Sequence, residues 1–329
     1  MHLSDEPIMD KITVDTGEMI DPVDPIVGYS FLGFLLSYSN DIIKIILNNL
    51  NKKMVNTVKF YSWLEYNEDS PFFVKIDVLY TCLFAALLYS IEAWGDVKKL
   101  ESKLLKIERE ALKRCLGVKN GTTNDLVYIE LRKADIIANI KDRQRNFYEK
   151  IMTFEPEFAV VRSIWNLVAS DERTKSFTDY YKSLEPGNKS KNISDRRSNV
   201  TNSESSMCTR YVNLVGMEYS EVLYNSSLID SKRKIITRWR LSSHKLKIET
   251  GRYTKPKTDP QERKCTLCDV IDDERHAMFE CIAHRLIRQQ YTELLQTRNS
   301  VKKMLNPTSI EEATKVANYL SAIEENMET

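Results

Sequence analysis

The stretch CTLCDVIDDERHAMFEC, residues 265–281, places three cysteines and one histidine in the spacing C-x2-C-x7-H-x4-C. Three thiolates and one imidazole complete a tetrahedral shell around Zn²⁺ and leave no open position for a substrate, so this pattern indicates a structural site. We predict one structural Zn²⁺ held by Cys265, Cys268, His276 and Cys281. His284 is an alternative fourth ligand. The alternatives to a metal site are a redox-active C-x-x-C pair or four unrelated residues.

A basic tract, residues 231–264, precedes this cluster. It contains twelve Lys or Arg and three Asp or Glu, a balance of +9, whereas the formal net charge of the whole chain is +1. Trp239 and Tyr253 lie within the tract. Cations bind phosphates and aromatic rings stack on unpaired bases, so this composition favours a nucleic-acid surface; a solvated helix face is the alternative. The predicted nucleic-acid contacts are Arg233, Arg238, Trp239, Arg240, His244, Lys245, Lys247, Arg252, Arg263 and Lys264.

The same region resembles the C-terminal part of non-LTR (LINE-like) retrotransposon reverse transcriptases. In that family a segment R-L-x-x-H-x-L-x-I-E-x-G-R leads into a C-x2-C…E-x-H…C knuckle. Here ITRWRLSSHKLKIETGRY, residues 236–253, is followed by ERKCTLCDVIDDERHAMFEC, residues 262–281. Order and spacing agree over some 40 residues, which makes the signal specific.

A second block, residues 87–131, resembles the thumb region of the same polymerases. LLYSIEAWGD is followed by LLKIEREALKRCLGVKNGTTNDLVYIEL, which matches the family pattern from Tyr89 to Leu131. Ser90 and Arg132 stand where the family usually has glycine, and this leaves the local turn geometry open. YSFLGFLLS, residues 29–37, is a weaker match to the strand pair that follows the palm.

The resemblance also implies what the chain lacks. Reverse transcriptases hold two Mg²⁺ ions on palm carboxylates, two of them in a Tyr/Phe-x-Asp-Asp hairpin. That motif does not occur here, and Asp272-Asp273 is the only Asp-Asp pair. No segment is a candidate endonuclease domain. We therefore expect a chain that begins just beyond the catalytic hairpin and is not an enzyme, because an active polymerase would need its palm from another chain.

The periodicity predicts a mainly α fold with four parts. We expect short β strands over residues 1–37, as a remnant of the palm–thumb junction, and a helical thumb-like domain over residues 38–169. Residues 170–206 are rich in Ser, Asn and charge, which predicts a flexible linker. Residues 207–329 form the basic helical and zinc-knuckle domain.

Localisation and partners follow from composition. Six cysteines in 329 residues, three of them assigned to zinc, favour a reducing compartment. The acidic N-terminus is no signal peptide, and the longest apolar stretch, residues 78–91, is too short to span a bilayer. We expect a nuclear or cytoplasmic protein with RNA or DNA as its partner, no membrane contact and no small-molecule substrate. The alternative is a zinc-dependent protein-interaction adaptor whose basic tract meets an acidic partner.

Overall fold

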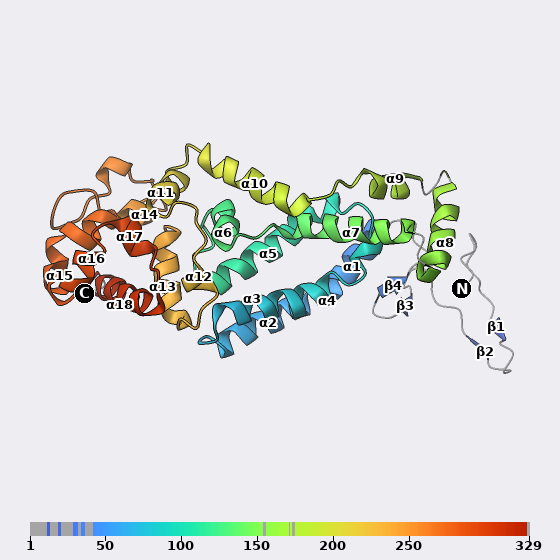
Figure 1. Cartoon of the computed structure of the whole chain (residues 1–329), viewed down its shortest axis with the longest axis horizontal. Helices are drawn as coiled ribbons and strands as arrows, with labels where there is room; N and C mark the ends of the chain where they lie inside the picture. The colour runs from blue at the N-terminus through green and yellow to red at the C-terminus, as the bar shows by residue number, and fades with distance from the viewer. Residues whose placement is uncertain are drawn as a thin grey trace. The chain divides into compact units, whose positions relative to one another are not determined.

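The computed structural model describes residues 12–13, 19–20, 29–31, 34–36, 42–153, 156–170, 172 and 175–327. The fold of this part is mainly helical, as predicted (Figure 1). Ahead of the first helix, β1 (Ile12–Thr13) pairs antiparallel with β2 (Met19–Ile20), and β3 (Tyr29–Phe31) pairs antiparallel with β4 (Phe34–Leu36). Most of the palm–thumb junction predicted for residues 1–37 lies outside the described residues.

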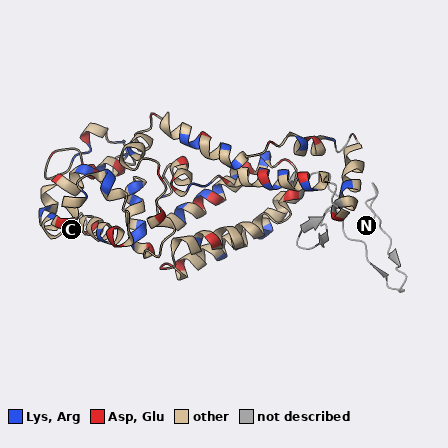
Figure 2. Ribbon diagram, in the orientation of Figure 1, with Lys and Arg blue, Asp and Glu red and all other residues tan. Residues whose placement is uncertain are grey.

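The chain divides into two compact units, and each is assembled from three separate stretches. Unit 1 contains residues 1–62, 80–103 and 140–186, whereas unit 2 contains residues 63–79, 104–139 and 187–329. The predicted thumb-like segment therefore contributes to both units. No helix in the described part of the chain combines the length and the apolar composition of a membrane-spanning segment. Basic and acidic residues are interspersed along the helices (Figure 2).

Unit 1 has an aromatic core. Ile151, Trp165, Tyr181 and Leu184 are buried together, and the Trp165 and Tyr181 rings meet edge to face at a centroid distance of 5.3 Å. The helices that contribute to this unit are α1 (Ile42–Lys53), α2 (Val55–Tyr66), α4 (Ala85–Leu87), α5 (Glu101–Leu116), α7 (Ile136–Met152), α8 (Ala159–Ser170) and α9 (Lys175–Ser183). Of these, α2, α5 and α7 also contribute residues to unit 2. Shorter helical turns cover Leu79–Phe84, Ile91–Ala93, Lys98–Leu100 and Pro156–Phe158.

Unit 2 is built around the packing of α13 (Asp230–Arg240) against α18 (Ile310–Asn326). Both helices direct an apolar face inward, with Ile236 on α13 and Val316, Leu320 and Ile323 on α18 fully buried. The other helices are α3 (Phe72–Val78), α6 (Asn124–Leu131), α10 (Asn188–Thr201), α11 (Ser206–Leu214), α12 (Glu221–Tyr224), α14 (Lys247–Thr250), α15 (Arg285–Gln290), α16 (Thr292–Thr297) and α17 (Val301–Leu305). Shorter turns cover Pro260–Glu262, His276–Glu280 and Ile282–His284.

The segment predicted as a flexible linker, residues 170–206, instead contains α9 and α10. On α9, the Phe177 ring lies against Gly95, where an added Cβ would be 3.0 Å from Phe177 Cδ2. The backbone N–H of Gly95 donates to the Tyr181 hydroxyl at 3.2 Å. Gly95 has φ +69°, and its missing side chain makes room for the α9 ring. The few aromatic residues of this polar segment are therefore sufficient to anchor it within unit 1.

A charged contact anchors the second half of the same segment within unit 2. The Arg196 guanidinium on α10 forms ion pairs with Asp125 and Asp135 and lies 4.1 Å from the centroid of the Tyr128 ring. Asn192 Nδ2 donates to Asp135 Oδ2 at 2.9 Å. The two carboxylates that pair with Arg196, those of Asp125 and Asp135, lie 71 and 61 residues away in the sequence. The local composition therefore predicted a flexible linker, because it contains none of these partners.

Two non-glycine residues next to helical segments have the left-handed conformation. Ser90 has φ +63° before the turn Ile91–Ala93, and Arg132 has φ +52° at the C-terminal end of α6. The backbone N–H of Arg132 bonds to the carbonyl groups of Tyr128 and Ile129, the usual termination of an α-helix by a left-handed residue. Glycine adopts this conformation without the steric cost that a side chain adds.

Candidate metal centre and basic tract

A tight turn brings the first two candidate ligands together. Lys264 and Ile271 form an antiparallel bridge, and the backbone N–H of Cys265 donates to the Val270 carbonyl at 2.8 Å. The chain reverses at Asp269, which has φ +53° and donates its N–H to the Cys265 carbonyl at 3.1 Å. The Cys-x-x-Cys segment is therefore a closed hairpin turn that presents both thiols.

The other two ligands lie at the two ends of a π-helical turn, His276–Glu280, since His276 is its first residue and Cys281 follows its last. The Asp273 carboxylate accepts the backbone N–H of His276 at 2.9 Å and caps the start of this turn. The backbone N–H of Cys281 donates to the His276 carbonyl at 2.8 Å and closes its end. This wider turn brings the two side chains, five positions apart, into one cluster.

The four side chains converge as predicted. The ligand atoms of Cys265, Cys268, His276 and Cys281 all lie within 4.8 Å of one another and can hold one metal ion. The Cys281 sulfur lies 3.8 Å from Cys265 Sγ and 4.0 Å from Cys268 Sγ. Both ring nitrogens of His276 are buried and have no hydrogen-bond partner among the described residues. A metal ion would satisfy one of these nitrogens and would offset the cost of burying it.

His284 is not part of this cluster. It is buried, and its Nδ1 lies 3.1 Å from the side-chain nitrogen of Asn326 on α18. Burial lowers the pKa of His284, with a further contribution from Arg288. The alternative in which His284 replaces one of the four ligands is therefore not the arrangement in the structure.

The thiols differ in their electrostatic environment. Burial raises the pKa of Cys281 to about 11. Burial also opposes ionisation of Cys265, but the backbone N–H groups of Leu267 and Cys268 lower the pKa of Cys265 to about 7. Of these two thiols, Cys265 therefore more readily becomes the thiolate that a metal requires.

Part of the basic tract positions the knuckle and does not face solvent. The buried Arg263 guanidinium donates to the carbonyl groups of Ile248, at 2.8 Å, and of Thr258, at 2.9 and 3.0 Å. His244 Nε2 lies 3.0 Å from Glu274 Oε1. Burial, with Arg210 and Lys119, holds the pKa of His244 well below 6.5, so the neutral ring donates from Nε2. Both residues therefore have internal partners and are not available as nucleic-acid contacts.

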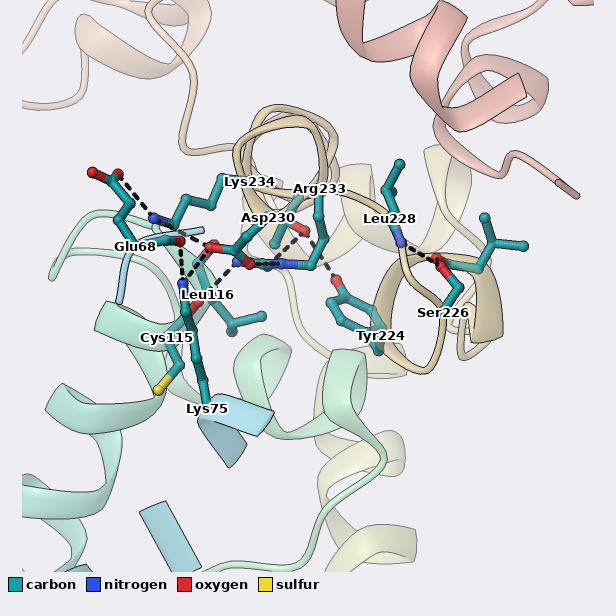
Figure 3. A network of polar contacts seen from close by, with 12 residues as sticks. Glu68, Lys75, Cys115, Leu116, Tyr224, Ser226, Leu228, Asp230, Arg233 and Lys234 are labelled. Carbon is teal, nitrogen blue, oxygen red and sulfur yellow. Dashed lines mark hydrogen bonds and ion pairs between the residues drawn. The ribbon is translucent and has the colours of Figure 1, made fainter. Parts of the chain in front are cut away.

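Arg233, a third predicted contact, lies in a buried ion cluster (Figure 3). Its Nε lies 2.7 Å from Asp230 Oδ1, and its Nη2 donates to the Cys115 carbonyl at 2.8 Å. Lys75 Nζ lies 2.6 Å from the other Asp230 oxygen. Side-chain exposure is 2% or less for Lys75, Asp230 and Arg233, so this cation stabilises the start of α13 and cannot reach a phosphate.

Arg240 and Trp239 are the fourth and fifth predicted contacts that prove to be buried. Arg240 Nε lies 2.5 Å from Glu130 Oε1, and neither side chain is exposed. Trp239 is 1% exposed, and its Nε1 donates to Glu324 Oε1 at 2.9 Å. The prediction that Trp239 stacks on a base is wrong, because the indole packs in the core of unit 2 and leaves no free face.

The other five predicted contacts keep exposed surface. Lys245 is exposed and Lys247 is half-buried. Arg238, Arg252 and Lys264 form partly exposed ion pairs with Glu324, Glu249 and Asp269, respectively. These five residues, all in unit 2, remain candidate nucleic-acid contacts.

The structure adds one cation that the sequence pattern missed. Lys119 follows α5, more than 100 residues before the basic tract, but its ammonium donates to the His244 carbonyl at 2.9 Å. Tyr253, which is 57% exposed, lies over Gly121 in the same loop, with its hydroxyl 2.9 Å from where a Cβ would be. Lys119 and Gly121 belong to the thumb-like block of the sequence, and only the fold shows that this loop lies against residues 244 and 253.

Compared with models of known protein families, with curated proteins and with solved structures, the chain matches none.

Proposed function

We propose that unit 2 is a zinc-stabilised nucleic-acid-binding module of the kind found in the C-terminal part of non-LTR reverse transcriptases. The observation that carries this proposal is the Cys₃His cluster, whose ligand atoms lie within 4.8 Å of one another beside the basic tract. Two thiolates on one tetrahedral Zn²⁺ lie about 3.8 Å apart, since each Zn–S bond is about 2.3 Å. The Cys281 sulfur has this spacing, 3.8 and 4.0 Å, from both of its neighbours.

Zinc is the metal that best fits this donor set. Soft thiolate and imidazole ligands in a closed set of four are typical of structural zinc, whereas Mg²⁺ and Ca²⁺ prefer oxygen. Residues 265–281 have only short turns of their own, so the four ligands would crosslink a segment with little apolar core. The metal would act on the fold and would have no open position for catalysis.

Two backbone conformations support the family resemblance. Ser90 and Arg132 occupy the positions where the resembling family usually has glycine, and both have positive φ, +63° and +52°. If the turns of that family are present in this chain, the backbone at their glycine positions should keep a positive φ even where another residue has replaced glycine. The short N-terminal strands would then correspond to the palm–thumb junction, which stays part of the proposal.

The proposed ligand is single-stranded RNA or DNA. Its phosphates would contact Arg238, Lys245, Lys247, Arg252 and Lys264, and an unpaired base would stack on the exposed ring of Tyr253 in place of the buried Trp239. The palm motif is missing from the sequence, so we propose no polymerase activity. A primer-extension assay with dNTPs and Mg²⁺ tests this point, and product above background in a highly purified sample would refute it.

A salt titration of oligonucleotide binding tests the main proposal. Log K should fall linearly with log salt, by about 0.7 units for each phosphate that is neutralised on a single strand. Replacing Lys247 and Lys264 with Gln should therefore reduce the slope by about 1.4 units. Lys98→Gln with Lys99→Gln is the matched control, since both lysines are exposed but belong to unit 1.

One observation favours the adaptor function as a second candidate. Four apolar side chains near the metal ligands are exposed, Leu267 at 68%, Val270 at 46%, Ile282 at 67% and Leu286 at 71%. Exposed apolar residues around a structural site are typical of protein-binding surfaces. If the wild-type protein has no salt-dependent affinity for any nucleic acid, the main proposal fails and this second candidate takes its place.

A further inference from the structure

A cavity of about 500 Å³ lies in unit 2 where two turns meet. One turn, residues 117–119, follows α5, and the other, residues 243–245, follows α13. These turns belong to the two sequence blocks that carry the family resemblance. Three cations, Lys119, Arg238 and Lys245, line the cavity together with a single carboxylate, Glu324.

The walls of the cavity are fixed by specific contacts. The backbone N–H of Lys119 donates to Ser243 Oγ at 2.8 Å, and its ammonium donates to the His244 carbonyl at 2.9 Å. Gly117 has φ +73°, and a Cβ there would be 2.7 Å from Lys234 Cγ. The positive φ and the close approach of the Lys234 side chain on α13 therefore favour glycine at this position, and the two hydrogen bonds from Lys119 hold the two turns together.

Lys119 has donor capacity that the described hydrogen bonds of the cavity do not use. Glu324 already accepts from Arg238 Nη2 at 2.8 Å and from Trp239 Nε1 at 2.9 Å. The Lys119 ammonium has three N–H donors, and only the one directed to His244 is used in a described hydrogen bond. Burial lowers the pKa of Lys119, which means that the folded protein solvates this cation less well than water does. An anion in the cavity would restore that lost solvation.

We propose that this cavity binds a phosphate group, and that the phosphate belongs to the backbone of a single-stranded nucleic acid. The inference rests on the proposed function and adds Lys119 to it. Tyr253 supports the assignment because its exposed ring lies over Gly121, two residues from Lys119. A strand whose phosphate occupies the cavity would therefore have an aromatic surface beside it for the adjacent base.

Two substitutions with opposite expected effects test the proposal. Lys119→Gln removes one cation and keeps an amide donor for the His244 carbonyl, so the salt slope for a dT oligonucleotide should fall by about 0.7 units. Glu324→Gln removes the carboxylate and keeps an acceptor for Trp239 Nε1. At low salt it should tighten oligonucleotide binding about threefold, because one negative charge leaves the vicinity of the phosphate. A thermal melt of Glu324→Gln that matches the wild type shows that the gain of affinity does not come from a loss of fold.

Controls and a second ligand separate this inference from the proposed function. Lys98→Gln should change neither measurement, and inorganic pyrophosphate should compete with the oligonucleotide for wild-type protein but not for Lys119→Gln. If the wild type binds the oligonucleotide while Lys119→Gln and Glu324→Gln leave affinity and slope unchanged, the cavity inference is wrong and the proposed function stands. If pyrophosphate and AMP bind through Lys119 and no oligonucleotide binds, the phosphate site stands with a free nucleotide as its ligand, and the proposed function fails.

Discussion

Glu130 and Arg240 form a fully buried ion pair that joins residues 87–131 to residues 236–281. Arg240 Nε lies 2.5 Å from Glu130 Oε1, and Arg240 Nη2 lies 3.1 Å from Glu130 Oε2. The same carboxylate accepts from the hydroxyl groups of Tyr211 and Tyr224. Both oxygens of the buried Glu130 carboxylate therefore have hydrogen-bond donors from distant segments of the chain. Only one arrangement of α6 and α13 within unit 2 satisfies these bonds, and that arrangement is favoured.

This relationship predicts that Arg240 is essential for folding and not for phosphate contact. Arg240→Ala leaves the Glu130 carboxylate buried without its cation, so the free energy of unfolding should fall by about 3–5 kcal/mol. Urea denaturation of Arg240→Ala, Glu130→Gln and the double variant measures the coupling between the two residues. If Arg240→Ala has wild-type stability but lower nucleic-acid affinity, Arg240 acts at the interface and the structural assignment is wrong.

The two aromatic residues of the basic tract should behave in opposite ways. Trp239→Ala removes a buried indole and should destabilise the protein by about 3–5 kcal/mol. Tyr253→Ala should leave the melting temperature unchanged and weaken single-strand binding by about 1–3 kcal/mol. Thermal melts beside filter-binding titrations distinguish these effects. Loss of stability in Tyr253→Ala would mean that the ring serves the fold.

Metal binding predicts one equivalent of zinc for each purified chain. Structural zinc sites in small peptides have apparent binding free energies on the order of 10 kcal/mol, so Cys268→Ser or a strong chelator should lower the melting temperature of unit 2. Cys82→Ser is the matched control, since Cys82 is an exposed cysteine outside the cluster. Elemental analysis that finds no stoichiometric metal in the wild type would contradict the assignment.

Helix termination at Arg132 predicts a stabilising substitution. Arg132 has φ +52° and an exposed side chain, so Arg132→Gly should relieve backbone strain and raise the free energy of unfolding by about 0.5–1 kcal/mol. Lys106→Gly, at an exposed position within α5, should instead cost about 1 kcal/mol. Chemical denaturation measures both, and a destabilised Arg132→Gly would show that the arginine side chain contributes more than its backbone conformation costs.

We expect the stability of the protein to depend on pH because His244 is buried. Burial, with Arg210 and Lys119, holds its pKa in the folded protein well below 6.5, whereas in the unfolded chain the ring protonates near pH 6.5. The unfolded state therefore gains a proton first, and stability should decrease as pH falls below about 6.5, by up to about 1.4 kcal/mol per pH unit.

His244→Gln is the variant that isolates this effect. It keeps a neutral donor for Glu274 and removes the titrating group, so its stability should change less between about pH 6.5 and pH 5.5. Ionisation of the metal ligands affects both proteins equally in this comparison. Identical pH profiles for the two proteins would rule out His244 as the origin of the dependence.

The sequence by itself determined the metal cluster and the helical class. All four ligands lie within residues 265–281, so two local turns, one closed at Val270 and one capped by Asp273, are sufficient to bring them together. The helical class likewise follows from the spacing of apolar residues over residues 42–152, whereas α9 and α10 lie in the segment predicted as a linker. Both features depend on residues that are near one another in the chain, which is the information that a pattern contains.

Only the tertiary structure decided the role of each basic residue. The charge count of residues 231–264 contains no information about Glu130, Glu274 and Glu324, which bind Arg240, His244 and Trp239 in the interior. The same is true of Lys119 and of Phe177 and Arg196, whose partners are distant in sequence. A side chain becomes buried or exposed according to what the fold brings against it, and an ion pair between distant segments leaves no trace in the local sequence around either residue.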